Sequence, residues 1–222
     1  KTNNDEILAQ TMVQGRRMYT TFATKDKYAQ FILGNAEGSD FCNEVLYGDV
    51  ATFIDLDCTL QVPELGFETV QEFIQGFNHI LINVYDEFLG QKLNKRSILW
   101  SESCREDKSS FHIKVENAVF SWKTSQVGTD LREFVKIIRD ETLKTQGYHF
   151  LKETGGEIQL QSIVDVGIYH SNRCFRTLNC LKTGIQKRLK PLKNAEHIPI
   201  THSILVSHMV TETGPTKNHT NS

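Results

Sequence analysis

The sequence predicts an α+β fold. Residues 67–89 and 130–143 place apolar side chains three and four positions apart, which is the spacing of an amphipathic helix. Around these helices lie alternating or β-branched segments, and several of them follow one another with no helix between them. Because direct strand-to-strand links exclude a regular βαβ alternation, we expect the strands to pair largely with one another rather than through helical crossovers.

The first third of the chain is predicted to contain short elements. We expect a helix at 5–13, a strand at 16–21, and a helix at 25–33 that ends at Gly34. Two strands are predicted at 44–47 and 50–56, and the Gly48-Asp49 pair between them is typical of a hairpin turn.

The rest of the chain contains the clearest helical pattern. In 67–89 the apolar stripe includes Phe73, Phe77 and Leu81, and Gly90 ends the helix. Further strands are predicted at 97–102, 111–115 and 163–169, with 174–178 as the hairpin partner of the last. From Ser207 onward the chain becomes polar, so we expect one core over 1–206 and a flexible C-terminal tail over 207–222.

Composition limits the class of protein. The chain has 222 residues, of which 39% are hydrophobic and 23% charged, as in globular proteins. Its longest apolar runs are too short to cross a membrane, so no membrane partner is expected. Five cysteines without Cys-x-x-Cys spacing favour an intracellular protein over a secreted or zinc-ribbon protein. The chain does not begin with Met, which suggests a piece of a longer polypeptide.

Charge is distributed unevenly along the chain. The formal net charge of −2 excludes a uniformly basic coat. Between positions 173 and 193, however, there are seven Lys or Arg and no acid. This stretch could form a phosphate-binding strip, or it could be an ordinary solvated surface.

Three acidic residues are candidates for metal binding. Asp55 and Asp57 are two residues apart in a predicted strand, so both side chains point to the same face. Asp165 lies between Val164 and Val166 and would point away from the core that those two residues enter. Carboxylates are the ligands that Mg²⁺ prefers, although an Asp-x-Asp strand alone is weak evidence. A buried Asp that accepts backbone hydrogen bonds is the alternative for Asp165.

A second strand carries a row of polar side chains. Lys108, Ser110 and His112 are each two residues apart, so in a strand all three face one way. An ammonium, a hydroxyl and an imidazole are suitable donors to a triphosphate. The alternative for His112 is a structural histidine in an apolar strand.

Taken together, three stretches of the chain resemble the archaeo-eukaryotic primase superfamily, and within it the PrimPol-like and large-DNA-virus primases. They are Asp55-Leu56-Asp57, Ser110-Phe111-His112, and the run from Val164 to Tyr169 that continues through Asn172-Arg173-Cys174-Phe175-Arg176. The resemblance spans about residues 15–184. The second acid is Asp57, where PrimPol-like proteins often have Glu.

The resemblance implies a catalytic core of two packed α/β modules, one of them RRM-like. It also implies that Asp55, Asp57 and Asp165 are catalytic and bind Mg²⁺ or Mn²⁺. By position, Arg173 would contact the template strand. The nucleotide would be bound by Lys108, Ser110, His112, Arg176, Lys182 and Arg17.

The function implied is template-directed nucleotidyl transfer, in which primers are synthesised or extended on single-stranded DNA from nucleoside triphosphates. A helicase domain in the same polypeptide, and a viral origin, would accompany this function in some relatives. Two alternatives remain open. The first is a metal-dependent nuclease, which would not need a row of triphosphate-binding groups. The second is a non-catalytic nucleic-acid-binding module of the same fold.

Overall fold

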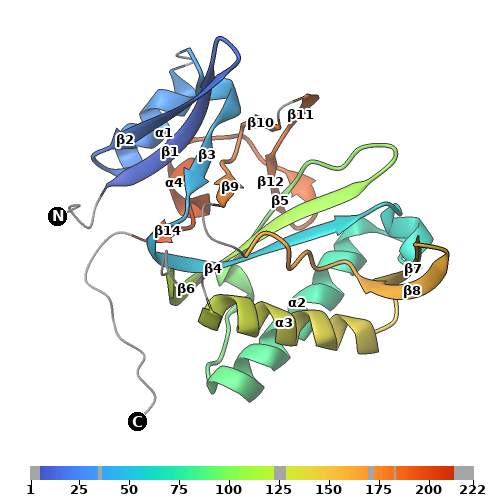
Figure 1. Ribbon diagram of the computed structural model, residues 1–222. Coiled ribbons are helices and arrows are strands. Elements are labelled where there is room, and N and C mark those ends of the chain that lie inside the picture. Colours follow the sequence, from blue (N-terminus) through green and yellow to red (C-terminus); the bar gives the residue numbers. More distant parts are fainter. Residues whose placement is uncertain (1–5, 35–36, 123–128, 170–172, 183, 213–222) are drawn as a thin grey trace.

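The computed structural model describes residues 6–34, 37–122, 129–169, 173–182 and 184–212. Four α-helices and a set of antiparallel sheets make up the described part of the chain, which confirms the predicted α+β class (Figure 1). No helix in these ranges is both long enough and apolar enough to span a bilayer.

A six-stranded antiparallel sheet forms the centre of the molecule, with strand order β13-β12-β5-β6-β4-β14. Its longest strands are β4 and β6, which pair along their whole length apart from one bulge after Ala51. The bounds of the six strands are Gly48–Cys58 (β4), Ile98–Glu102 (β5), Ser109–Trp122 (β6), Lys190–Lys193 (β12), Glu196–His197 (β13) and Thr211–Glu212 (β14).

Two long helices, α2 (Val70–Leu89) and α3 (Thr129–Lys144), cover one face of this sheet (Figure 1). Leu56 of β4 pairs directly with Phe111 of β6, and the Phe111 ring packs 5.3 Å from that of Phe73 in α2. Both periodic helices were therefore predicted correctly. A hairpin of β7 (His149–Thr154) and β8 (Glu157–Ser162) follows α3.

A second, smaller module lies on the other side of the central sheet (Figure 1). Its four-stranded sheet has the order β2-β1-β3-β9, and helices α1 and α4 pack against each other beside it. The bounds are Ile7–Val13 (β1), Arg16–Phe22 (β2), Lys25–Leu33 (α1), Asn43–Val45 (β3), Cys174–Arg176 (β9) and His202–His208 (α4).

The remaining elements are short. Strands β10 (Leu181–Lys182) and β11 (Ile185–Arg188) form a small ribbon after β9. Three 3₁₀ helices connect the longer elements, at Ser39–Phe41 (η1), Val62–Leu65 (η2) and Lys95–Ser97 (η3).

Three of the predicted elements differ from the structure. The predicted helix at 5–13 is strand β1, which buries Ile7, Ala9 and Thr11 alternately between its neighbours. The strands around Gly48-Asp49 do not form a hairpin, because β3 and β4 belong to different sheets. The segment 163–169 is not a strand but forms a single bridge, Val164 to Leu56.

The predicted partner of that segment was also wrong. Strand β9 pairs with β3, with Phe175 opposite Glu44, and joins the small module rather than the central sheet. The pairing is between residues more than a hundred positions apart, and no local pattern in the sequence encodes it.

The prediction of a flexible tail from Ser207 is wrong for residues 207–212. Val210 is fully buried, and Thr211 pairs with Val50 at the edge of the central sheet. The buried carboxylate of Glu44 accepts hydrogen bonds from the backbone N–H groups of Val210 and Thr211, with shortest distances of 3.0 and 2.9 Å. The rest of the predicted tail, 213–222, lies outside the described residues.

Candidate active site

The face of the central sheet opposite α2 and α3 carries the predicted acids. Since Leu56 faces the helices, Asp55 and Asp57 on either side of it face the small module. Asp165 reaches them from the other edge of β4, where its backbone N–H donates to the Asp55 carbonyl at 2.9 Å. The structure therefore brings all three predicted acids to the same end of one strand.

His112 lies directly opposite Asp55 in the β4–β6 pair. Its Nε2 is 3.6 Å from Asp55 Oδ1, and its ring packs 4.5 Å from that of Phe175 in β9. Burial lowers the pKa of His112 well below its ordinary value, and the positive charges of Arg176 and Lys182 lower it further. The imidazole is therefore neutral at physiological pH and has one N–H to donate.

The other two members of the predicted row lie beside Asp57. Ser110 is its cross-strand partner, and the Lys108 Nζ is 2.6 Å from Asp57 Oδ2. Lys108 precedes β6 in a tight turn in which it pairs with Arg105, yet its side chain still reaches the carboxylates. The same-face arrangement expected from the strand period is thus present in the structure.

Arg176 and Lys182 add positive charge from the small module. Arg176 extends from β9 and donates to the Ser103 hydroxyl at 2.6 Å, next to Ser110. Lys182 is exposed on β10. The charges of Arg176 and Lys182 both act on Asp55 and His112. These four groups therefore share one electrostatic environment although they come from four different strands, β4, β6, β9 and β10.

The carboxylates also repel one another. Burial raises the pKa of Asp55 to about 7, with further contributions from Asp57 and Asp165. The positive charges of Arg176 and Lys182 act in the opposite direction without cancelling the rise. A site that concentrates negative charge in this way is stabilised by a bound cation.

The chemistry of the donors fits a hard divalent cation. Asp57 Oδ1 is buried, and in the described part of the chain it has no hydrogen-bond partner. Oxygen donors from carboxylates are what Mg²⁺ and Mn²⁺ prefer. Within the described ranges, no three His, Cys, Asp or Glu side chains already converge on one point. Asp57 is paired with Lys108 and the Asp165 carboxylate with the Gly167 N–H, so both would exchange partners on binding.

Two predicted residues lie apart from the acids. Arg17 is exposed on β2, and strands β1 and β3 lie between β2 and β9. At about 4.8 Å per strand this separates β2 from β9 by roughly 14 Å. Arg173 is exposed just before β9, and its carbonyl accepts from Leu46 N at 3.3 Å. Neither residue contacts the carboxylates.

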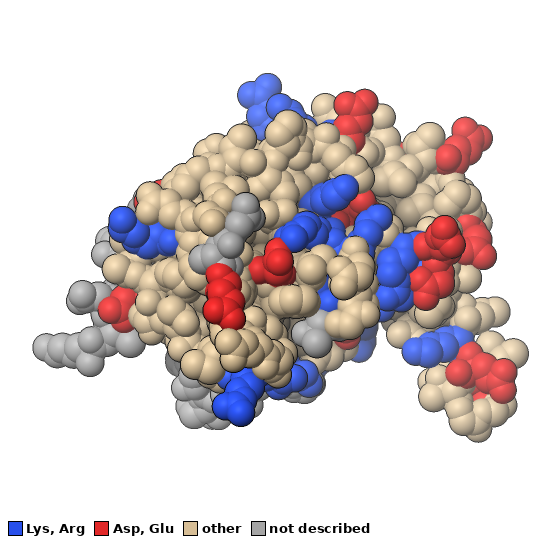
Figure 2. Space-filling view, turned by 90° about the horizontal axis from the view of Figure 1, so that it is seen from above, with Lys and Arg blue, Asp and Glu red and all other residues tan. Residues whose placement is uncertain are grey.

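The basic strip of 173–193 is divided among β9 to β12. Arg188 is held by Asp40 and the Asn179 carbonyl, while Lys182, Lys190 and Lys193 are exposed. Figure 2 shows Lys and Arg side chains gathered to the right of the middle of this face, with Asp or Glu side chains beside them. The strip is therefore only partly available to a polyanion.

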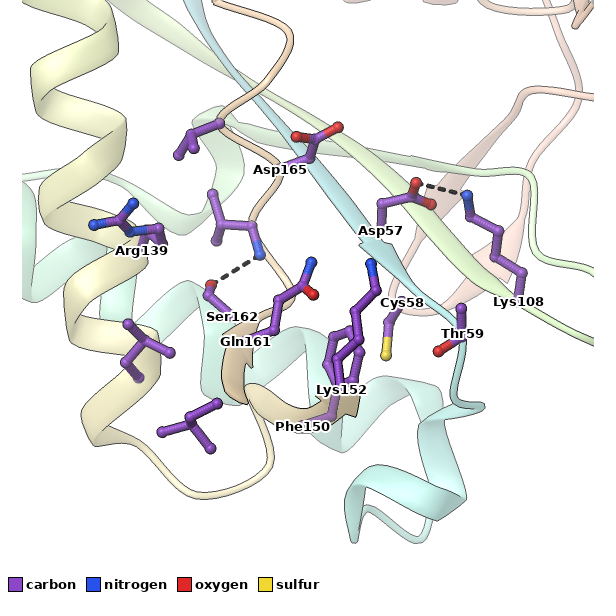
Figure 3. Close-up of a pocket in the computed structure, with 14 residues that line it drawn as sticks. Asp57, Cys58, Thr59, Lys108, Arg139, Phe150, Lys152, Gln161, Ser162 and Asp165 are labelled. Carbon is purple, nitrogen blue, oxygen red and sulfur yellow. Dashed lines mark hydrogen bonds and ion pairs between the residues drawn. The ribbon is translucent and has the colours of Figure 1, made fainter. Parts of the chain in front are cut away.

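A cavity of about 530 Å³ opens beside Asp57 and Asp165 (Figure 3). Arg139 of α3, Lys152 of β7 and Gln161 of β8 line it, and none of them was a predicted site residue. Ser103, which positions Arg176, was also missed. Ser103 continues the alternating face pattern of β5, which is a weak sequence signal for a site residue. Arg139 and Lys152 lie in no recognisable motif.

Comparison with known proteins gives no assignment. No protein family matches the sequence, and no curated protein is significantly similar to it.

Proposed function

We propose that this protein catalyses template-directed nucleotidyl transfer, as a DNA primase or primase-polymerase that synthesises or extends primers on single-stranded DNA. One observation carries the proposal. Asp55 and Asp57 lie near one end of β4, and Asp165, more than a hundred positions away in sequence, lies beside them and beside the Lys108, Ser110 and His112 row. That combination of acids and donors is what transfer of a nucleotidyl group between charged substrates requires.

The positively charged and hydrogen-bond-donating side chains fall into two groups: some would bind the nucleotide, and Lys108 pairs with an acid in the free protein. His112, Arg176 and Lys182 form the side of the site from which a triphosphate would be bound. Lys108 neutralises Asp57 in the free protein and would donate to a phosphate once a cation replaced it there. Phe175 packs on the His112 ring and limits its rotation.

In the proposed reaction the 3′-hydroxyl oxygen of a primer, or of a first nucleotide, bonds to the α-phosphorus of the next nucleotide. The bond between the α-phosphorus and its bridging oxygen to the β-phosphate breaks, pyrophosphate leaves, and the hydroxyl proton passes to solvent. Mg²⁺ or Mn²⁺ held by Asp55, Asp57 and Asp165 would lower the pKa of the hydroxyl and neutralise charge on the phosphates. The protein's own part is to align the two reacting groups.

A gel assay tests the proposal. The protein is incubated with single-stranded DNA, labelled ribo- or deoxynucleoside triphosphates, and Mg²⁺ or Mn²⁺, with and without an annealed primer. We expect a ladder of labelled products that depends on template and metal. Labelled products only in the primed reaction would indicate extension without priming, which the proposal includes.

The same assay separates the alternatives. Shortening of an end-labelled DNA without incorporation would favour the metal-dependent nuclease. Binding of DNA with neither reaction would favour the non-catalytic module. The nucleoside triphosphates, the single-stranded template, an attached helicase domain and an intracellular site of action all remain parts of the proposal.

A further inference from the structure

Of the proposed nucleotide-binding residues, Lys108 alone is among those that line the cavity beside the acids. The cavity lies between α3, the β7–β8 hairpin and the last residues of β4 (Figure 3). Asp57 and Asp165 line it together with Lys108, which pairs with Asp57 at 2.6 Å. Arg139 from α3 and Lys152 from β7 also line it and add positive charge. A volume of about 530 Å³ is within the usual range for ligand sites, which runs from roughly 300 to 1,000 Å³.

Two of the basic residues of the cavity come from elements that carry none of the acids, Arg139 from α3 and Lys152 from β7. In Figure 3 the Lys152 side chain extends from β7 toward the end of β4, while Arg139 stands on α3 across the cavity. Within the described part of the chain, the ion-pair partner of Arg139 is the adjacent Asp140, at 2.7 Å, and this contact is partly exposed. Exposed ion pairs of this kind contribute little to stability, so the guanidinium can exchange its partner for a phosphate at small cost.

Apolar side chains complete the lining. Leu143 from α3 and Leu160 from β8 stand beside the charged groups, with Val164 and Val166 next to Asp165. Leu160 is half exposed and so presents apolar surface to solvent. Cations for phosphates together with apolar surface for sugars and bases suit a nucleic-acid strand better than a free anion.

The cavity lies on the side of β4 where the attacking hydroxyl is expected from the stereochemistry of phosphoryl transfer. The attacking and leaving oxygens lie roughly in line on opposite sides of the phosphorus. His112 is on β6, at one edge of β4, so a triphosphate bound there directs its pyrophosphate toward the β6 and β9 side. Val164 pairs with Leu56 at the other edge of β4, and the cavity opens on that side.

We propose that this cavity binds the 3′-terminal nucleotides of the primer strand, with their phosphates on Arg139 and Lys152. The inference rests on the proposed function, because it assigns the attacking substrate of the same site. It places the 3′-hydroxyl at the Asp57 and Asp165 wall, across the acids from the nucleotide. In this arrangement the template strand would bind on the opposite side of the site, near Arg173.

Steady-state kinetics on the full chain test the assignment. The double variant Arg139→Gln with Lys152→Gln removes both charges and leaves shorter, neutral polar side chains. We expect the KM for primer–template to rise about tenfold or more, because charge-assisted phosphate contacts are lost, and the KM for the nucleotide to stay within about twofold. Lys136→Gln, on α3 but not in the cavity lining, is the matched control and should behave as the wild type.

Several outcomes would overturn the assignment. A rise in the nucleotide KM without a rise for primer–template would mean that the cavity holds the triphosphate. No change in either constant would mean that no substrate occupies it. Because both residues are at least partly exposed, the variant should unfold at the wild-type temperature, and circular dichroism checks this.

A second measurement separates this inference from the proposed function. A primer with a photoreactive base at its 3′ end is annealed to template and cross-linked to the wild-type protein. We expect cross-linked peptides from α3 and the β7–β8 hairpin, residues 139–166. Cross-links confined to residues 173–193 would overturn the inference while incorporation by the wild type still supported the proposed function. Absence of incorporation by the wild type would remove both.

Discussion

At the scale of single residues, the site depends on negative charges held closer together than they would be in water. Asp55, whose side chain is 18% exposed, lies beside two other carboxylates, and desolvation and their charges raise its pKa to about 7. Such crowding does not stabilise the fold by itself. It is typical of positions selected to hold a cation or to carry out chemistry.

The three acids are therefore expected to be essential for activity and dispensable for folding. We predict that Asp55→Ala, Asp57→Ala and Asp165→Ala each abolish nucleotide incorporation, and that the free energy of unfolding does not fall. Incorporation is measured in the primed gel assay with saturating metal, and stability by urea denaturation. Asp86→Ala on α2, an exposed acid on the helix-covered side of the sheet, should retain wild-type activity. Near-normal incorporation by any of the three variants would remove that residue from the site.

His112 tests the nucleotide side of the site. Although the imidazole is neutral, its N–H would donate to an ionised phosphate, and such bonds contribute roughly 1.5–3 kcal/mol. We predict that His112→Ala raises the KM for the nucleotide about tenfold to a hundredfold and leaves DNA affinity nearly unchanged. Nucleotide titration in the extension assay measures the first quantity, and fluorescence anisotropy with labelled DNA measures the second.

The control for His112→Ala is the substitution of an exposed histidine. His79→Ala on α2 should change neither quantity. If His112→Ala reduced DNA affinity and left nucleotide use intact, the imidazole would belong to the DNA-binding surface instead.

At the scale of elements, the sequence predicted those with strong local patterns. Helices α2 and α3 were found because their apolar stripes repeat over several turns. Strand β1 was taken for a helix, since Ala9, Gln10 and Met12 favour helices locally, while pairing with β2 and β3 decides the outcome. The strand period also predicted that Lys108, Ser110 and His112 share a face.

Contacts between site residues from elements far apart in the sequence could not be predicted from local patterns. That Asp55 lies opposite His112 depends on the register of β4 against β6, which no local pattern specifies. Arg139 and Lys152 reach the site only because α3 and the β7–β8 hairpin pack beside the end of β4. The resemblance to primases supplied candidate acids, whereas the cavity beside them required the fold.

Strand β14 joins the end of the described chain to both sheets. The Glu44 carboxylate accepts from Val210 and Thr211, and Lys25 and Lys114 both pair with Glu212, at 3.2 and 3.3 Å. These contacts connect β3 and α1 of the small module to β6 of the central sheet. They hold the two sides of the candidate active site relative to each other.

Glu44→Ala is expected to weaken this connection. The change leaves two buried N–H groups without their acceptor, so we predict that the free energy of unfolding falls by about 1–3 kcal/mol. Urea denaturation followed by circular dichroism measures the fall. Glu87→Ala, an exposed acid on α2, is the control and should unfold at the wild-type midpoint. An unchanged midpoint in Glu44→Ala would mean that β14 is held by its ladder with β4 alone.

At the scale of the whole molecule, the candidate active site lies where the two modules meet. The central sheet contributes the acids and the His112 row, while β9 and β10 of the other side contribute Arg176 and Lys182. Outside this region charge is mixed, and the net charge is −2. Long-range attraction to nucleic acid is therefore weak, and binding has to depend on a few local contacts.

The mixed surface charge and the low net charge predict how the protein binds DNA. We expect binding to single-stranded DNA to be weak, indifferent to sequence and sensitive to salt, with a log–log slope of about −0.7 for each phosphate contact. Arg173 is exposed and forms no contact with the acids, so its side chain is free to reach a template phosphate. Arg173→Ala should make the slope shallower by roughly one contact, and Lys95→Ala in η3, away from the site, should leave it unchanged. Fluorescence anisotropy at several salt concentrations measures each slope. An unchanged slope in Arg173→Ala would mean that the template runs elsewhere, along the exposed Lys190 and Lys193 of β12.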